Sequence, residues 1–191
     1  MSLDKPIIAV KYIFNRDDPL ILNGLMEDLA LYEDEDLKIP EGILYTCKVW
    51  HVGRNIYLEG TSKAKVIHPC DRCLTPVTMD LTGVIEAIYV RKDPKYEGRT
   101  LKYKIEETEV DDLANLIYYD EDTLDFSDRI AESILTEIPS KVLCKEDCKG
   151  LCPVCGANWN YEKCEHYGKA DQYEIDPRFK VLEKYKLNSG E

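Results

Sequence analysis

The fold is decided by three consecutive stretches, ILYTCKVWHV (43–52), NIYLEGTSKAKVIH (55–68) and PVTMDLTGVIEAIYVR (76–91). The first two are rich in β-branched and aromatic residues, which favour strands, and Gly53-Arg54 between them predicts a hairpin turn. The third alternates with a period of two, which predicts a half-buried strand. Its apolar face carries Val77, Met79, Leu81, Gly83, Ile85, Ala87 and Tyr89. The three stretches therefore predict an antiparallel β-meander, with CDRC (70–73) at one tip.

The flanking sequence predicts helices and short strands around this meander. Residues 126–138 (FSDRIAESILTEI) have apolar residues every four positions from Phe126 to Ile138, and Asp125 is a suitable N-cap, so we expect a helix. The remaining expected elements are a strand at 7–14, a short helix within 17–42, short strands at 101–105 and 115–119, and a short amphipathic helix at 179–187.

The predicted class is α+β: an antiparallel β-meander packed with one or two helices, plus a small C-terminal zinc-knuckle segment. We expect an α+β domain over residues 1–140, a cysteine-rich zinc-binding segment over 141–170 and a C-terminal amphipathic helix within 171–191. A chain of 191 residues is long enough for one domain with a small appendage.

The charge of the chain is acidic but unevenly spread. The formal net charge is -12, which argues against a nonspecific phosphate binder. Residues 43–79, in contrast, carry five Lys or Arg residues against only Glu59 and Asp71. No stretch approaches the roughly 20 apolar residues that span a bilayer, and the N-terminus has no apolar signal-peptide region. We therefore expect a cytoplasmic protein without a membrane partner.

Eight cysteines suggest metal binding, because a disulfide framework is typical of short secreted chains. They are Cys47, Cys70, Cys73, Cys144, Cys148, Cys152, Cys155 and Cys164. The sharpest motif is Cys152-Pro-Val-Cys155-Gly, in which two thiolates from one tight turn can bind one ion and the glycine permits a left-handed conformation. This spacing predicts a structural Zn²⁺ site near the C-terminus.

The sequence leaves the ligand set open. The first choice is Cys148, Cys152, Cys155 and Cys164, and His166 in place of Cys148 gives a second set. Cys144 is either a ligand or a core thiol. Cys70 and Cys73 form a weaker CxxC motif that is half of a second site shared with Cys144 and Cys148 or His68, a redox pair, or a structural turn. Cys47 lies in an apolar strand pattern and is expected in the core.

Four stretches in this order resemble the YceD family of large ribosomal RNA subunit accumulation proteins. They are CDRCLTPV (70–77), DFSDRIAESILTEIPSKVLC (125–144), CKGLCPVCGANWN (148–160) and IDPRFKVLEKY (175–185). The resemblance implies a non-enzymatic role in the accumulation or processing of large-subunit (23S) ribosomal RNA. It implies this RNA or its precursor as partner, with ribosomal proteins as further candidates. This chain ends its cluster Cys-Glu-His where relatives often show a second cysteine, which leaves the last ligand open.

An RNA-binding role requires a cationic face, and the meander offers one. Its basic residues are Lys48, Arg54, Lys63, Lys65 and Arg72, beside the aromatic rings of Trp50, His51, Tyr57 and His68. Each has a structural alternative, because strand aromatics are usually core and strand lysines usually solvated. A second candidate face surrounds the knuckle, with Lys145, Lys149, Asn158, Trp159 and Lys163.

Two other classes of function compete with RNA binding. In one, zinc only shapes an adaptor surface for another protein. In the other, the chain is an enzyme, but the sequence has no Gly-rich phosphate loop, HExxH motif or nucleophile elbow. We therefore expect neither catalysis nor a small-molecule substrate.

Overall fold

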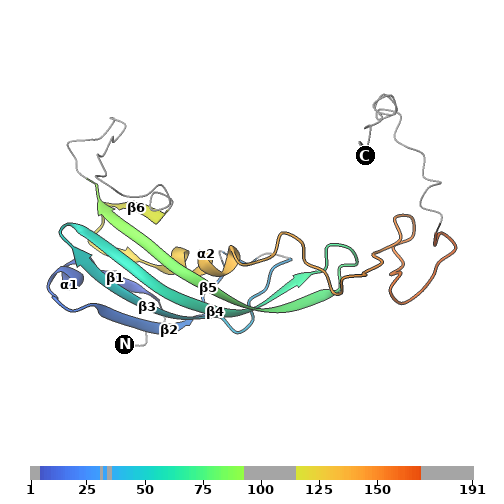
Figure 1. Ribbon diagram of the computed structural model, residues 1–191, viewed down its shortest axis with the longest axis horizontal. Helices are drawn as coiled ribbons and strands as arrows, with labels where there is room; N and C mark the ends of the chain where they lie inside the picture. The colour runs from blue at the N-terminus through green and yellow to red at the C-terminus, as the bar shows by residue number, and fades with distance from the viewer. Residues whose placement is uncertain (1–4, 31, 34–35, 93–114, 169–191) are drawn as a thin grey trace, which may run out of the picture.

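The computed structural model describes residues 5–30, 32–33, 36–92 and 115–168 (Figure 1). Its main sheet has the strand order β2-β3-β4-β5-β6, in which neighbours are antiparallel except for the parallel pair β5 and β6. These strands are β2 (Leu20–Met26), β3 (Ile43–Val52), β4 (Asn55–Pro69), β5 (Pro76–Arg91) and β6 (Leu116–Tyr119). A second, two-stranded sheet pairs β1 (Ile7–Ala9) with β7 (Thr123–Asp125), and the described helices are α1 (Val10–Phe14) and α2 (Ser127–Leu135).

The predicted meander is confirmed by the pairing of β3, β4 and β5. Val52 pairs with Asn55 across a two-residue turn, and Gly53 in that turn has φ +58°, a conformation that glycine adopts without strain. From Pro76 to Ala87 on β5, exposed residues alternate with buried or half-buried ones, as the period of two predicted. The mixed α+β class is therefore confirmed.

The core lies between the inner face of the main sheet and a layer formed by α2 and the small sheet. Phe126, Ile130 and Ile134 are fully buried against inward-facing strand residues. The ring of Phe126 meets that of Tyr89 on β5 edge-on, with centroids 5.3 Å apart. Burial of each such side chain contributes about 1.5–3 kcal/mol. Cys47 is 2% exposed in this core, which confirms its predicted place.

The β4–β5 hairpin projects beyond the rest of the sheet and carries the first cysteine pair. Pairing between β3 and β4 ends at Ile43 and Ala64, whereas β4 and β5 remain paired as far as Pro69 and Pro76. Figure 1 shows this long hairpin reaching toward the chain that follows α2. The tip turn, residues 70–75, is therefore placed away from the core and next to the other cysteines.

Three local predictions differ from the structure. The predicted strand at 7–14 ends at Ala9, and α1 follows, because Val10 and Ile13 are both buried at a helical spacing of three. The short helix expected within 17–42 is wrong for the described residues there, which form β2 with Leu22 and Met26 buried at an even spacing. The helix expected over 126–138 is shorter, Ser127–Leu135.

Some expectations concern other parts of the chain. The strand at 101–105 and the amphipathic helix at 179–187 lie outside the described residues. Within the described ranges, no helix combines the length and the apolar character that a bilayer crossing needs.

Candidate metal centres

The hairpin tip places Cys70 and Cys73 on one side of a tight turn. The N–H of Cys70 donates to Thr75 O, and the N–H of Leu74 donates to Cys70 O, both over 2.9 Å. Leu74 has φ +59°, and among the described residues it is the one position other than glycine with positive φ. The turn therefore brings two sulfurs together at the cost of backbone strain. Cys70 is fully buried and Cys73 is 4% exposed.

The segment after α2 docks on this turn through reciprocal hydrogen bonds. The N–H of Asp71 donates to Val142 O (2.9 Å), and the N–H of Val142 donates to Asp71 Oδ2 (2.7 Å). Arg72 Nη1 donates to Cys148 O over 2.8 Å. These contacts bring Cys144 and Cys148 to the hairpin tip, across more than 70 residues of sequence.

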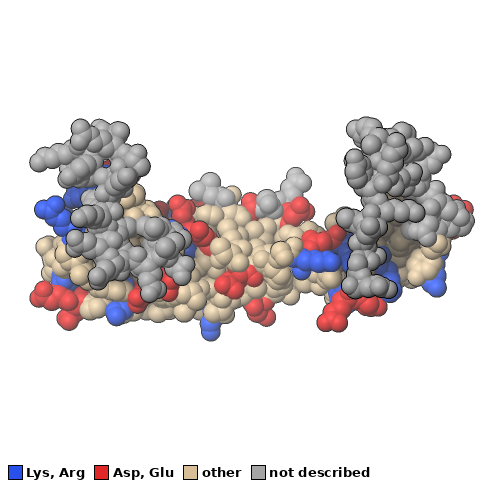
Figure 2. All heavy atoms as spheres, turned by 45° about the horizontal axis from the view of Figure 1, so that its top comes forward, with Lys and Arg blue, Asp and Glu red and all other residues tan. Residues whose placement is uncertain are grey.

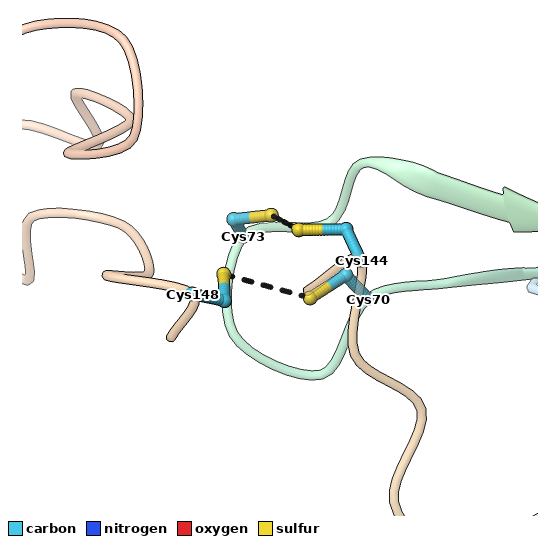
Figure 3. Close-up of side chains that lie close together, drawn as sticks. All are labelled: Cys70, Cys73, Cys144 and Cys148. Carbon is cyan, nitrogen blue, oxygen red and sulfur yellow. Dashed lines mark hydrogen bonds between the residues drawn. The ribbon is translucent and has the colours of Figure 1, made fainter. Parts of the chain in front are cut away.

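Cys70, Cys73, Cys144 and Cys148 form a compact group of sulfurs that we call the hairpin centre. All four sulfurs lie within 4.8 Å of one another. The Cys70 and Cys148 sulfurs are 3.8 Å apart, and those of Cys73 and Cys144 are 3.5 Å apart (Figure 3). Tetrahedral zinc with Zn–S bonds of about 2.3 Å places its sulfurs about 3.8 Å apart. The hairpin centre therefore fits a Cys₄ zinc site.

The electrostatics of the hairpin centre favour thiolates at the CxxC pair. Burial alone raises the pKa of Cys70, but the backbone N–H groups around it outweigh burial and lower the pKa to about 6. The hydroxyl of Thr75 lowers the pKa of Cys73. Desolvation and the neighbouring sulfurs raise the pKa of Cys144 to about 12. Four thiolates in this space would repel one another, and a divalent cation would supply the compensating charge.

A second group, the C-terminal centre, contains Cys152, Cys155, Cys164 and His166. Their ligand atoms also lie within 4.8 Å of one another. The predicted tight turn is present: the N–H of Gly156 donates to Cys152 O over 2.9 Å, with φ +73° at Gly156. Although burial raises the pKa of Cys152, the N–H groups of Cys155 and Val154 lower it to about 7.

The other two ligand candidates of the C-terminal centre are oriented by their neighbours. Trp159 Nε1 donates to Cys164 Sγ over 3.3 Å and lowers the pKa of this thiol. The Trp159 ring also meets Tyr167 edge-on, with centroids 5.4 Å apart. Buried His166 Nδ1 has no hydrogen-bond partner among the described residues. One ring nitrogen of His166 lies within 4.8 Å of the three sulfurs and supplies the fourth donor of a Cys₃His zinc site, so this set also fits.

The structure divides the predicted ligands differently from the first choice. That set joined Cys148 to Cys152, Cys155 and Cys164, whereas the structure brings Cys148 to the hairpin tip and puts His166 beside the other three. Both groupings correspond to alternatives that the sequence left open. The His68 alternative is not brought into either group, and His68 Nδ1 lies 2.8 Å from Pro69 O.

Sequence reasoning missed Asn160, whose Nδ2 donates to Cys148 Sγ over 3.3 Å. The signal available was its position in the polar run Asn158-Trp159-Asn160 between two cysteine motifs. An amide so placed can donate to a thiolate, but the sequence alone does not reveal which one.

The five predicted RNA-binding residues are dispersed along the meander. Lys48 and Lys63 are exposed on β3 and β4, whereas Arg54 lies in the β3–β4 turn and Arg72 in the β4–β5 turn, at opposite ends of β4. Lys65 forms an ion pair with Glu41, and Arg72 contacts Cys148 O. Figure 2 shows basic and acidic side chains interspersed over the visible face. The structure therefore brings only some of the five to one surface.

One aromatic and cationic group does form on the outer face of the sheet. The rings of Trp50 and Tyr57 stack with centroids 5.6 Å apart and an interplanar angle of 17°. Lys48 Nζ lies 4.8 Å from the centroid of the Trp50 ring. Trp50 and Tyr57 are both half-buried. This group combines a flat ring surface with a positive charge.

Comparisons with known proteins support the same family as the motifs. The family model described as large ribosomal RNA subunit accumulation protein YceD matches residues 58–186. Uncharacterized proteins of Mycobacterium bovis and Mycobacterium tuberculosis are each 27% identical over 150 residues, 78% of this chain and 65% of the relative. One of Mycobacterium leprae is 25% identical over 126 residues, 66% of this chain and 53% of the relative.

The chain thus spans only 65% or less of the length of these curated relatives. No solved structure matches the chain. The family match covers more than half of the sequence and includes every residue of the hairpin centre and the C-terminal centre. The chain belongs to the YceD family of large ribosomal RNA subunit accumulation proteins.

Proposed function

We propose that this protein promotes the accumulation or processing of large-subunit ribosomal RNA in the cytoplasm without catalysing a reaction. The observation that carries the proposal is the family match over residues 58–186, which takes in both cysteine groups and most of the long hairpin. In this role the protein binds the 23S RNA or its precursor and stabilises one folded form of that RNA. Basic ribosomal proteins are further partners, which the net charge of -12 would attract.

Structural zinc at both centres is part of this proposal. Each group offers four ligands, Cys₄ at the hairpin centre and Cys₃His at the C-terminal centre. Four protein ligands leave no coordination position for water, which supports a structural rather than a catalytic metal. Residues 139–168 contain no helix or long strand, and metal binding would supply the free energy that orders them.

The surface we propose for RNA is the outer face of β3 and β4 around Lys48, Trp50 and Tyr57. Stacked rings accept an unpaired base, and the lysine beside them is within reach of a phosphate. Lys63 is a second exposed cation on this face of β4, and Glu59, the cross-strand partner of Lys48, lies between it and Tyr57. Lys65 and Arg72 are weaker candidates, because they contact Glu41 and Cys148 O.

The test is a gel-shift titration of 23S RNA fragments with the full chain at several salt concentrations. We expect Lys48→Glu and Lys63→Glu together to weaken binding by about tenfold or more and to flatten the salt slope by about 0.7–0.9 per lost phosphate contact. Lys11→Glu, an exposed position on α1, is the matched control and should leave both quantities unchanged. Unchanged affinity and slope in the double variant would reject this face.

A protein-interaction adaptor is the second candidate, because the same outer face also carries apolar side chains. Leu44 and Val84 are 56% and 63% exposed, and Ile21 is 51% exposed. Exposed apolar surface of this kind favours contact with another protein. An adaptor would show no salt-dependent shift with any RNA fragment, whereas Leu44→Ser would abolish capture of a protein partner.

A further inference from the structure

Two adjacent residues, Trp159 and Asn160, donate to a sulfur of each candidate metal centre. Trp159 Nε1 donates to Cys164 Sγ of the C-terminal centre, and Asn160 Nδ2 donates to Cys148 Sγ of the hairpin centre, each over 3.3 Å. Hydrogen bonds of this kind fix the orientation of a ligand and stabilise its anionic form. The two centres therefore share one short segment of supporting donors.

This segment is held in one conformation by hydrogen bonds at both ends of the Asn160 amide. Asn160 Oδ1 accepts from the N–H of Lys149 over 3.0 Å, and Asn160 Nδ2 also donates to Asn158 Oδ1 over 2.9 Å. The backbone N–H of Trp159 donates to Gly150 O over 3.0 Å. Because Trp159 and Asn160 are adjacent, a backbone shift that moves the amide away from Cys148 would also move the indole beside Cys164.

The linker between the two centres is clamped against the hairpin tip as well. Cys148 and Cys152 belong to different centres but are separated by only three residues. Within that linker, the N–H of Leu151 donates to Arg72 O over 3.0 Å. Gly150 has φ +78°, and a Cβ added there would lie 3.1 Å from Arg72 O. The linker leaves little freedom for one centre to move independently of the other.

We propose that the two centres bind Zn²⁺ cooperatively, with Asn160 and Trp159 as the positioning residues that couple them. The inference rests on the metal binding in the proposed function and extends it to the order of loading. An ion at the hairpin centre fixes the Cys148 thiolate, which fixes Asn160 and the indole next to it. The Cys164 sulfur is then already oriented for the second ion. By linkage, an ion at the C-terminal centre raises the Zn²⁺ affinity of the hairpin centre by the same factor.

The test measures the Zn²⁺ affinity of the C-terminal centre by competition with a chromophoric chelator in four full-length chains. These are the native chain, Cys70→Ser with Cys73→Ser, Asn160→Leu, and the combination of all three changes. Leucine has a similar size to asparagine but no donor. We expect loss of the hairpin centre to weaken the C-terminal centre about tenfold with Asn160 present, and about twofold or less in the Asn160→Leu background. Tyr161→Phe, at a neighbouring side chain that is 79% exposed, is the control.

If loss of the hairpin centre lowers the Zn²⁺ affinity of the C-terminal centre equally with Asn160 and with Asn160→Leu, Asn160 does not couple the centres. Two ions bound with independent affinities would overturn the coupling alone, whereas a chain that binds no zinc would overturn the proposed metal binding too. If the serine variants fail to fold, native mass spectrometry of the native and Asn160→Leu chains at one equivalent of Zn²⁺ decides. For centres of equal intrinsic affinity, tenfold coupling lowers the one-zinc species from about a half to about a quarter of the protein. A one-zinc share as large in the native chain as in Asn160→Leu overturns the proposal.

Discussion

Gly83 on β5 lies directly against the backbone of Ser133 on α2. A Cβ added to Gly83 would stand 2.1 Å from Ser133 O and 2.8 Å from Ser62 Oγ. Real atoms do not approach so closely, so Gly83→Ala must push the helix away from the sheet. We expect the free energy of unfolding to fall by about 1–3 kcal/mol, measured as a lower urea midpoint at unchanged slope.

Thr82→Ala is the matched control for Gly83→Ala, because Thr82 is the exposed neighbour on the same strand. It should change the free energy of unfolding by about 0.5 kcal/mol or less. If both variants lose a similar amount of unfolding free energy, the close approach of α2 does not depend on the missing side chain at Gly83.

A buried pair of hydroxyls fixes the same contact between sheet and helix. Ser62 Oγ and Ser133 Oγ are 2.7 Å apart, and Ser133 Oγ also donates to Ile130 O over 2.7 Å. Ser133→Ala leaves the Ser62 hydroxyl buried without this partner, so we expect a loss of about 1–3 kcal/mol in unfolding free energy. Ser62→Ala with Ser133→Ala removes both polar groups and should lose less than the sum of the single variants. An additive result in a double-mutant cycle would contradict the pairing.

The β-meander could be predicted because its signals are local. Gly53 marks the turn, and the alternation from Val77 to Tyr89 fixes which face of β5 is buried. The shorter elements could not be predicted in the same way. β2 is a short stretch between acidic segments, so its sequence carries no clear strand pattern. Its pairing with β3 shows that it is a strand.

The cysteines could be predicted as candidate metal ligands, but the sequence did not predict how the structure groups them. Cys148 is four positions from Cys152 in the sequence and 78 from Cys70, so proximity along the chain favours a different neighbour from the one that the structure gives. The reciprocal bonds between Asp71 and Val142 bring the distant pair together, and nothing in the spacing of the cysteines encodes them.

Because the backbone at Leu74 is strained, we predict that glycine at this position increases the stability of the protein. Its φ of +59° costs about 1–2 kcal/mol for a residue with a Cβ, and its side chain is 62% exposed, so little packing is lost on truncation. Glycine gains more freedom in the unfolded chain, which offsets part of the relief. We expect Leu74→Gly to raise the unfolding free energy by about 0.5–1 kcal/mol in a chemical denaturation experiment. Val154→Gly, an exposed residue of the other cysteine turn without positive φ, should lower it.

The grouping of the cysteines predicts which of the two proposed zinc ions a Cys148 variant loses. Cys148 Sγ lies 3.8 Å from Cys70 Sγ, so Cys148→Ser should reduce bound zinc from two ions to one by emptying the hairpin centre. Adding Cys70→Ser should then leave the remaining ion in place, whereas adding Cys155→Ser should remove it. Native mass spectrometry of the three full-length chains counts the ions directly. If Cys148→Ser with Cys70→Ser carries no zinc while Cys148→Ser with Cys155→Ser keeps one ion, Cys148 serves the C-terminal centre instead, because the ion lost with Cys148 is then the one that Cys155 also binds.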